Sequence, residues 1–149
     1  MTIEQNQAGG ATGSGAPADL APRLGARVID AVILVILGAL LGLLLGFGFA
    51  WLVVQAVVVF GYFVLLDTTR GTTPGKQIVG LRVTGPEGGS PTTGQAAARE
   101  AFILLGAIPF AGPVLALIAW IIIAVTIRSS PTRQGKHDEL AGGTRVVTA

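Results

Sequence analysis

The sequence predicts an all-α membrane protein, with a transmembrane helical hairpin, a third, kinked membrane segment and a small cytoplasmic β-strand element. Two long runs lead to this prediction: residues 31–66 and residues 101–127 contain no charged side chain. A single bilayer crossing needs only about 20 apolar residues. Charged residues make up 12% of the chain, whereas about 25% is usual for soluble domains. Most of the chain is therefore predicted to lie in a bilayer.

The first uncharged run is about twice as long as one crossing requires, so we expect two spans, over residues 28–46 and 48–66. The tripeptide Gly46-Phe47-Gly48 is the predicted turn, because its two glycines permit the non-helical dihedrals of a tight turn. Small residues also recur every four positions along the first span, at Gly38, Gly42 and Gly46. This spacing lets helix backbones approach closely, so these glycines are predicted to pack against the second span or against a partner.

The second uncharged run, residues 101–127, is predicted to be kinked over residues 109–113, because Pro109, Gly112 and Pro113 interrupt helical hydrogen bonding. Three arrangements remain open: one bent crossing, a short interfacial helix followed by a crossing, and a hairpin that turns back. The cationic side chains favour the last arrangement. If the chain turns back, all ten lysines and arginines share one side of the membrane, which the positive-inside tendency identifies as the cytoplasmic side.

The N-terminal segment differs in composition from the rest of the chain. Residues 1–22 are rich in Gly, Ala, Ser, Thr and Pro and contain few bulky apolar side chains. Such a segment cannot bury enough surface to offset its ordering entropy, so it is predicted to be a disordered tail. The membrane domain is predicted to cover residues 23–148.

The two remaining polar segments are predicted to carry short strands. In the loop over residues 67–100, β-branched side chains predict a strand near residues 77–83, followed by a glycine-rich turn and a short helix. The polar tail over residues 128–149 ends in a second predicted strand at residues 144–148. The two strands can pair only if the loop and the tail lie on the same side of the membrane.

Three charged residues stand at the start of the first span: Arg23, Arg27 and Asp30. Both arginines lie near the helical face of Asp30, at spacings of seven and three residues. One interpretation is an interfacial ion pair that fixes the helix register. The other is that Asp30 is a proton or cation site, because ionisable groups in membrane helices are often functional. In the loop, Lys76 and Arg82 are predicted to contact lipid headgroups.

No catalytic, metal or cofactor site is predicted. The segment from Gly71 to Gln77 has the glycines and lysine of a phosphate loop, but its glycines are too close and Gln77 replaces the required hydroxyl. The chain has no cysteine and one histidine, and His137-Asp138-Glu139 is more typical of a cap or turn than of a metal site. We expect no enzymatic activity, because the sequence shows no catalytic constellation. We expect no nucleic-acid binding either, because cationic residues beside spans are typical of contact with anionic lipid.

Four separate motifs together resemble the RDD family of bacterial membrane proteins. They are Arg23-Leu24-Gly25-Ala26 with Asp30, Gly71-Thr72-Thr73-Pro74-Gly75-Lys76 continuing to Gly80-Leu81-Arg82-Val83, then Arg99, and His137-Asp138-Glu139-Leu140-Ala141-Gly142. The family is named for one arginine and two aspartates, which match Arg23, Asp30 and Asp138. The chain departs from the family pattern at Gly143, an additional glycine before Thr144.

The resemblance implies a multi-pass protein of the bacterial inner membrane. The positive-inside tendency predicts that its N-terminus is cytoplasmic. It strengthens the interpretation that Arg23, Asp30 and Asp138 matter beyond packing. It also implies transport of an ion or small ligand that the sequence does not identify. About three spans are too few to enclose a pathway, so transport would require a homo-oligomer. The alternative is an accessory or scaffold subunit of a larger membrane complex.

Overall fold

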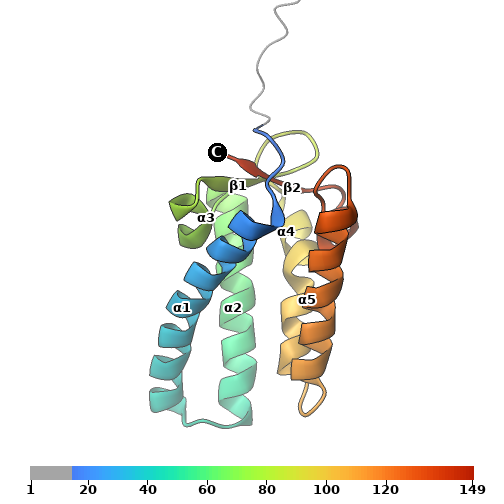
Figure 1. The fold of residues 1–149 in the computed structure, drawn as a ribbon. Helices are drawn as coiled ribbons and strands as arrows, with labels where there is room; N and C mark the ends of the chain where they lie inside the picture. The colour runs from blue at the N-terminus through green and yellow to red at the C-terminus, as the bar shows by residue number, and fades with distance from the viewer. Residues whose placement is uncertain (1–14) are drawn as a thin grey trace, which may run out of the picture.

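The computed structural model describes residues 15–149, which form two antiparallel helical hairpins capped at one end by short helices and a two-stranded sheet (Figure 1). We call this capped end the polar end. In chain order, the helices of the two hairpins are α1 (Leu20–Leu45), α2 (Phe49–Arg70), α4 (Thr93–Glu100), the 3₁₀ helix η1 (Ala101–Ala107) and α5 (Gly112–Ser129). Within the described part of the chain, α1, α2 and α5 are long and apolar enough to cross a membrane. The predicted all-α membrane fold is confirmed.

The first hairpin turns where the glycines predict it. Helix α1 ends at Leu45 and α2 begins at Phe49, and Gly46 has a φ of 76°, which favours glycine. The helices extend beyond the predicted spans at their polar ends, since α1 begins at Leu20 and α2 continues to Arg70. The charged residues Arg23, Arg27 and Asp67 near these ends do not stop the helices, because each forms an ion pair inside the protein.

Two of the three predicted packing glycines lie inside the first hairpin. A Cβ at Gly38 would lie 2.6 Å from Gln55 Nε2, and one at Gly42 would lie 2.1 Å from the ring of Phe47. Trp51 Nε1 also donates to the carbonyl of Gly38 over 2.8 Å. Both glycines are therefore covered within the chain. Gly46 belongs to the turn, and a Cβ there would meet no atom of the described chain within 4 Å, so its packing against a partner stays a prediction.

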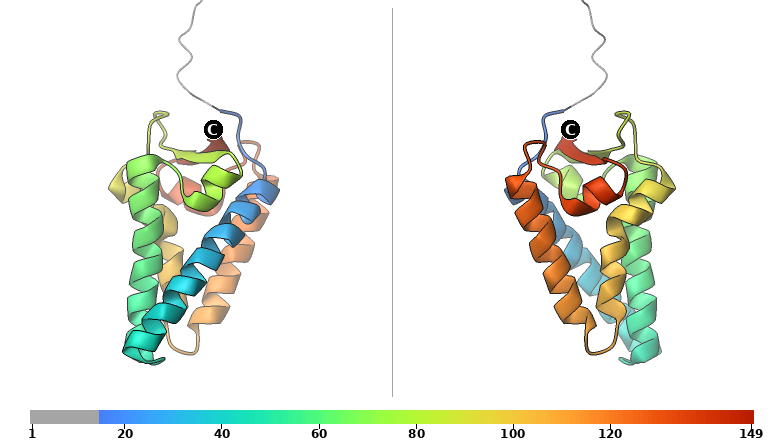
Figure 2. Two further views of the ribbon diagram at one scale, coloured as in Figure 1. Left: turned by 90° about the vertical axis from the view of Figure 1, so that its left-hand side faces the viewer. Right: turned by 90° about the vertical axis from the view of Figure 1, so that its right-hand side faces the viewer.

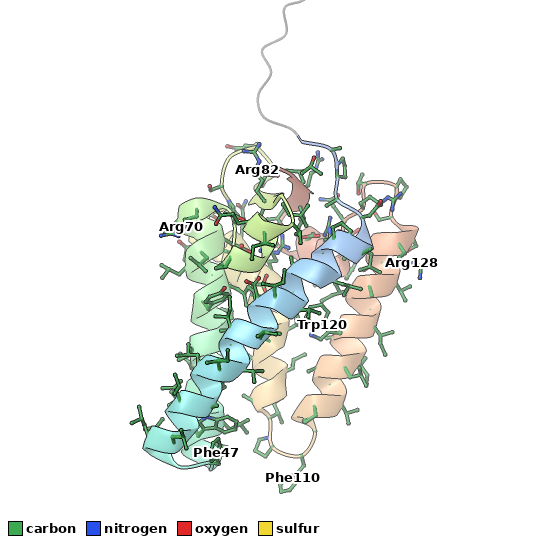
Figure 3. The ribbon with its side chains drawn as sticks, turned by 60° about the vertical axis from the view of Figure 1, so that its left-hand side comes forward. Phe47, Arg70, Arg82, Phe110, Trp120 and Arg128 are labelled. Atoms are coloured by element: carbon green, nitrogen blue, oxygen red, sulfur yellow. The ribbon has the colours of Figure 1, made fainter. Side chains whose placement is uncertain are left out.

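The second uncharged run is a hairpin and not a single kinked span. Helices α4 and η1 run away from the polar end, and α5 returns to it (Figure 2). Figure 3 shows Phe110 at the same end of the molecule as Phe47, opposite Arg70, Arg82 and Arg128. Pro109 and the positive φ of Phe110, 63°, reverse the chain here. The structure thus has the arrangement that the cationic side chains favoured.

At the polar end, the loop and the tail pair as a small sheet. Strand β1 (Leu81–Thr84) is antiparallel to β2 (Arg145–Thr148), with Leu81 opposite Thr148. This confirms the predicted pairing and places both segments at one end. The first strand begins later than predicted, because the short helix α3 (Pro74–Ile78) occupies the preceding residues. A second short helix, α6 (Lys136–Leu140), precedes β2.

The predicted disordered tail is too long at its C-terminal end. Residues 1–14 of that tail lie outside the described residues, so its prediction is untested there. Residues 15–22 are ordered: Ala18 N donates to Val146 O over 2.9 Å, and Pro17 forms a bridge with Val147. The segment lacks an apolar core of its own, but the free edge of β2 supplies hydrogen-bond partners for its backbone.

The shared side of the loop and tail can be tested directly, because the chain contains no cysteine. Glu87 and Lys136 are exposed at the polar end. We expect an impermeant maleimide to label Glu87→Cys and Lys136→Cys in inside-out vesicles and neither in intact cells, as a cytoplasmic polar end requires. Labelling of only one of the two variants in intact cells would contradict the shared side.

Candidate functional site

Eight ionisable side chains meet at the polar end, between the two hairpins. We call them the charged cluster: Arg23, Arg27 and Asp30 of α1, Asp67 of α2, Lys76 of α3, Arg99 and Glu100 of α4, and Asp138 of α6. The four carboxylates are each at most 1% exposed. Burial of a charge is costly unless it is paired and hydrogen-bonded. The partners of these carboxylates therefore decide how the elements are arranged.

Asp138 is bound by two arginines from different elements. Arg23 Nη1 lies 3.0 Å from Asp138 Oδ2, and Arg99 Nη1 lies 2.9 Å from Oδ1. Gly135 N and the Thr144 hydroxyl also donate to this carboxylate. Burial alone would raise the pKa of Asp138, but the positive charges around it, led by Arg99, lower that pKa to about 2. Asp138 thus holds α6 between α1 and α4.

Glu100 connects the second hairpin to the first. Arg27 Nη2 donates to Glu100 Oε2 over 2.6 Å, and Arg99 Nε donates to Oε1 over 3.3 Å. Burial would raise the pKa of Glu100, but the two arginines lower it to about 2. The guanidinium of Arg27 also lies 3.9 Å from the ring centre of Phe63 on α2, a favourable cation–π distance.

Asp67 is paired with Lys76, whose ammonium lies 2.5 Å from Oδ1. Lys76 is 7% exposed, and burial lowers its pKa although Asp67 opposes the shift. The prediction that Lys76 contacts lipid headgroups is therefore wrong, because α3 turns its side chain inward. Arg82 lies on β1 at the polar end and is partly exposed (Figure 3). Its contact with headgroups stays a prediction.

Asp30 accepts hydrogen bonds from three uncharged donors. They are the Tyr62 hydroxyl at 2.9 Å, the Thr73 hydroxyl at 2.5 Å and Gly75 N at 2.8 Å. The expected ion pair between Asp30 and an arginine of α1 is absent from residues 15–149. Arg23 and Arg27 share the helical face of Asp30, but both reach across to acids of the second half of the chain.

The segment Thr73-Pro74-Gly75-Lys76 docks α3 onto α1. The hydroxyl of Thr73 caps α3 by accepting from Lys76 N, and Pro74 starts the helix where no backbone donor is needed. Gly75 is required by the close approach of the helices, because a Cβ there would lie 2.1 Å from the carbonyl oxygen of Ala26. The motif that resembles a phosphate loop thus serves to bind the carboxylate of Asp30.

Five residues of the charged cluster line one side of a cleft between the hairpins. We call the part of the cleft nearer the polar end the upper cavity, lined by His137, by Ile123 and Ile127 of α5, and by Arg23, Arg27, Asp30, Lys76 and Arg99 of the cluster. The part nearer the turns is the lower cavity, whose lining is apolar except for Arg27, Gln55 and Trp120. Arg27 and Trp120 line both cavities, and Figure 3 shows Trp120 between α1 and α5. Among residues 15–149, no three acidic or histidine side chains converge as a metal ion requires.

Sequence reasoning missed two acids of the charged cluster, Asp67 and Glu100. Asp67 directly follows the first uncharged run, and Glu100 directly precedes the second. A carboxylate at the border of a membrane run is costly unless it is paired. That position was a usable signal that each acid has a buried cationic partner, but it could not identify the partner.

The close approach at Gly75 leads to a stability prediction. Gly75→Ala should lower the free energy of unfolding by ~2 kcal/mol, because the new methyl group collides with backbone of α1 and separates α3 from Asp30. Gly94→Ala in α4 is the matched control, since a Cβ at Gly94 meets no atom within 4 Å. Thermal unfolding in detergent measures both variants, and an equal loss in the two would contradict the docking of α3.

The single histidine predicts a pH dependence of stability. Burial lowers the pKa of His137 from 6.5 to about 4, although Asp138 opposes the shift. Between these values the unfolded chain binds a proton and the folded chain does not, so stability decreases as the pH falls from 6.5 to about 4.

We expect this loss to be on the order of 2 to 3 kcal/mol, and to be much smaller in His137→Gln. The lowered pKa values of Glu100 and Asp138 add a separate loss only below about pH 4.5. Unfolding midpoints measured from pH 7 to pH 4 check this prediction. Parallel curves for the two proteins would show that His137 is not the responsible group.

The part of the chain that carries the charged cluster matches a known family. The family model described as the RDD family matches residues 17–142. This range starts at the bridge between Pro17 and Val147 and includes the whole charged cluster. No curated protein and no solved structure matches the chain. Because the match covers most of its length, the chain belongs to the RDD family.

Proposed function

We propose that the protein transports an ion or a small charged ligand as an oligomer, and that Asp30 takes up a proton or a cation. One observation carries this proposal. In the described part of the chain, Asp30 is the one carboxylate of the charged cluster that has no cationic side chain within ion-pair distance. A proton or a cation bound there would neutralise a buried charge that the protein itself leaves unpaired.

The surroundings of Asp30 suit such a site. Asp30 lines the upper cavity, so a small ion has a space beside the carboxylate. Its partners Tyr62 and Thr73 bind through hydroxyl groups, which rotate and can accept as well as donate. The hydroxyl oxygens of Tyr62 and Thr73 can therefore also accept contact from a bound cation. The ammonium and guanidinium groups around the other acids are donors only and cannot.

Transport would require more than one copy of the chain. From Asp30 toward the turns, the lower cavity has a mostly apolar lining, so a single copy offers an ion few polar groups along the remaining span. Two or more copies could enclose a path at the interface between them. This is why the proposal includes a homo-oligomer.

Purified protein in liposomes tests the proposal. A sodium or potassium gradient should drive proton movement that a pH-sensitive dye inside the liposomes reports. Asp30→Asn should reduce the rate at least about tenfold, because the neutral amide cannot exchange a proton or balance a cation. Glu139→Gln is the matched control, since Glu139 is exposed and pairs with the nearby Lys136. Absence of flux in the unaltered protein would contradict the proposal.

A second function is favoured by the apolar lining of the lower cavity. If one copy has no path, the chain could instead be an accessory subunit that completes a larger membrane complex. The two proposals differ in what accompanies the protein out of native membranes. A stoichiometric partner recovered by mild detergent extraction, together with no flux for the chain alone, would favour the accessory role. Self-association together with flux would favour transport.

A further inference from the structure

We propose that the lower cavity binds an anionic phospholipid, with a charged headgroup oxygen at Arg27 and one acyl chain among the apolar side chains. This lipid site is separate from Asp30 and does not depend on the transport proposed above. Four features of the described residues support it: an unused donor on Arg27, the aromatic rings around that side chain, the apolar lining of the cavity, and its opening on the flank of two membrane helices.

Arg27 retains an unused donor at the junction of the two cavities. Its Nη2 donates to Glu100, but its buried Nη1 has no hydrogen-bond partner among residues 15–149. A buried donor without a partner costs about 1 to 3 kcal/mol. The side chain is 19% exposed and lines the lower cavity. An anionic oxygen that enters the cavity can therefore approach the guanidinium, and a small rotation of the group would present Nη1.

Three aromatic rings fix the guanidinium of Arg27. The ring centres of Phe63, Trp120 and Phe102 lie 3.9, 5.2 and 5.9 Å from Arg27 Cζ. These rings come from α2, α5 and η1, so both hairpins hold the group. A cation that is held in advance loses little entropy when it binds an anion. The rings also provide an apolar surface for the first carbons of a lipid chain.

The rest of the lower cavity matches an acyl chain. Apart from Arg27, its lining is mainly apolar, with contributions from Leu34, Val59, Ile103 and Ala116. The cavity has a volume of about 300 Å³, far more than the ~10–15 Å³ that one water molecule needs on the same measure. The space suits a hydrocarbon chain better than a single small ion.

The opening and the charge of the cavity identify the occupant. Its rim residue Val35 is 69% exposed on α1, a helix that is apolar and long enough to cross a membrane. In a bilayer, lipid is therefore the molecule that meets this opening. No acidic side chain lines the lower cavity, so nothing there would pair with the positive group of a zwitterionic headgroup. Charge complementarity favours an anionic lipid.

The chain supplies its own reporter for this site. It has two tryptophans, and Trp51→Phe leaves Trp120, which lines the cavity beside Arg27. Brominated lipids quench tryptophan fluorescence on contact. In Trp51→Phe protein reconstituted in mixed bilayers, brominated phosphatidylglycerol should quench Trp120 at a lower mole fraction than brominated phosphatidylcholine. The preference should be about fivefold, as expected for one cation near anionic lipid.

Three further variants separate this site from general attraction to the surface. Arg27→Gln should abolish the preference, whereas Arg128→Gln, which removes an exposed charge of α5, should keep it. If Arg27→Gln fails to fold, Ala116→Phe serves instead, because it fills the lower cavity and leaves the charged cluster intact. We expect Ala116→Phe to reduce quenching by both lipids and to remove the preference.

Three results would each contradict the proposed lipid site. Equal quenching by the two lipids in Trp51→Phe protein would show that Arg27 does not select charge. A preference that survives Ala116→Phe would show that the lipid binds elsewhere. Stronger quenching by a brominated fatty acid than by phosphatidylglycerol would assign the cavity to a free carboxylate instead of a phospholipid. The quenching of Trp120 does not depend on ion flux. The lipid proposal and the transport proposal can therefore fail independently of each other.

Discussion

The need to pair buried charges is the constraint on which the arrangement of the two hairpins depends. Arg23 and Arg27 lie on α1, but their partners Asp138 and Glu100 lie in the second half of the chain. Removal of one partner from a buried ion pair costs about 3 to 5 kcal/mol, because the other charge is left uncompensated. Lipid is as apolar as the helix surfaces, so the hydrophobic effect contributes little to helix association in a bilayer. The charged cluster, more than the apolar faces, positions the hairpins.

The ion pairs join the hairpins at the polar end. The cleft between α1 and α5 contains the upper cavity near that end and the lower cavity nearer the turns. The same cluster gives each cavity its chemistry. Asp30 brings an acid without a cationic partner to the upper cavity, and Arg27 brings a donor without an acceptor to the lower one. Within residues 15–149 most charges of the cluster are thus paired, and the Asp30 carboxylate and Arg27 Nη1 carry the two proposed binding sites.

The sequence was sufficient for features that depend on local patterns. Uncharged runs predicted the spans, Gly46 and Gly48 predicted the first turn, and β-branched residues predicted the strand in the loop. The ion pairs of the cluster were not predictable in this way. Spacing along a helix placed Arg23 near Asp30, yet the partner of Arg23 is 115 residues away. The inward position of Lys76 likewise depends on the docking of α3, which a lone motif does not reveal.

A double-mutant cycle on Arg27 and Glu100 tests the central claim that buried ion pairs join the hairpins. Arg27→Met, Glu100→Gln and the double variant would be compared with the unaltered protein by unfolding in detergent. A coupling free energy of ~2 kcal/mol or more is expected, because Glu100→Gln leaves Arg27 without a carboxylate and Arg27→Met leaves Glu100 with Arg99 alone. Losses that add to within about 0.5 kcal/mol would show that the pair does not connect the hairpins.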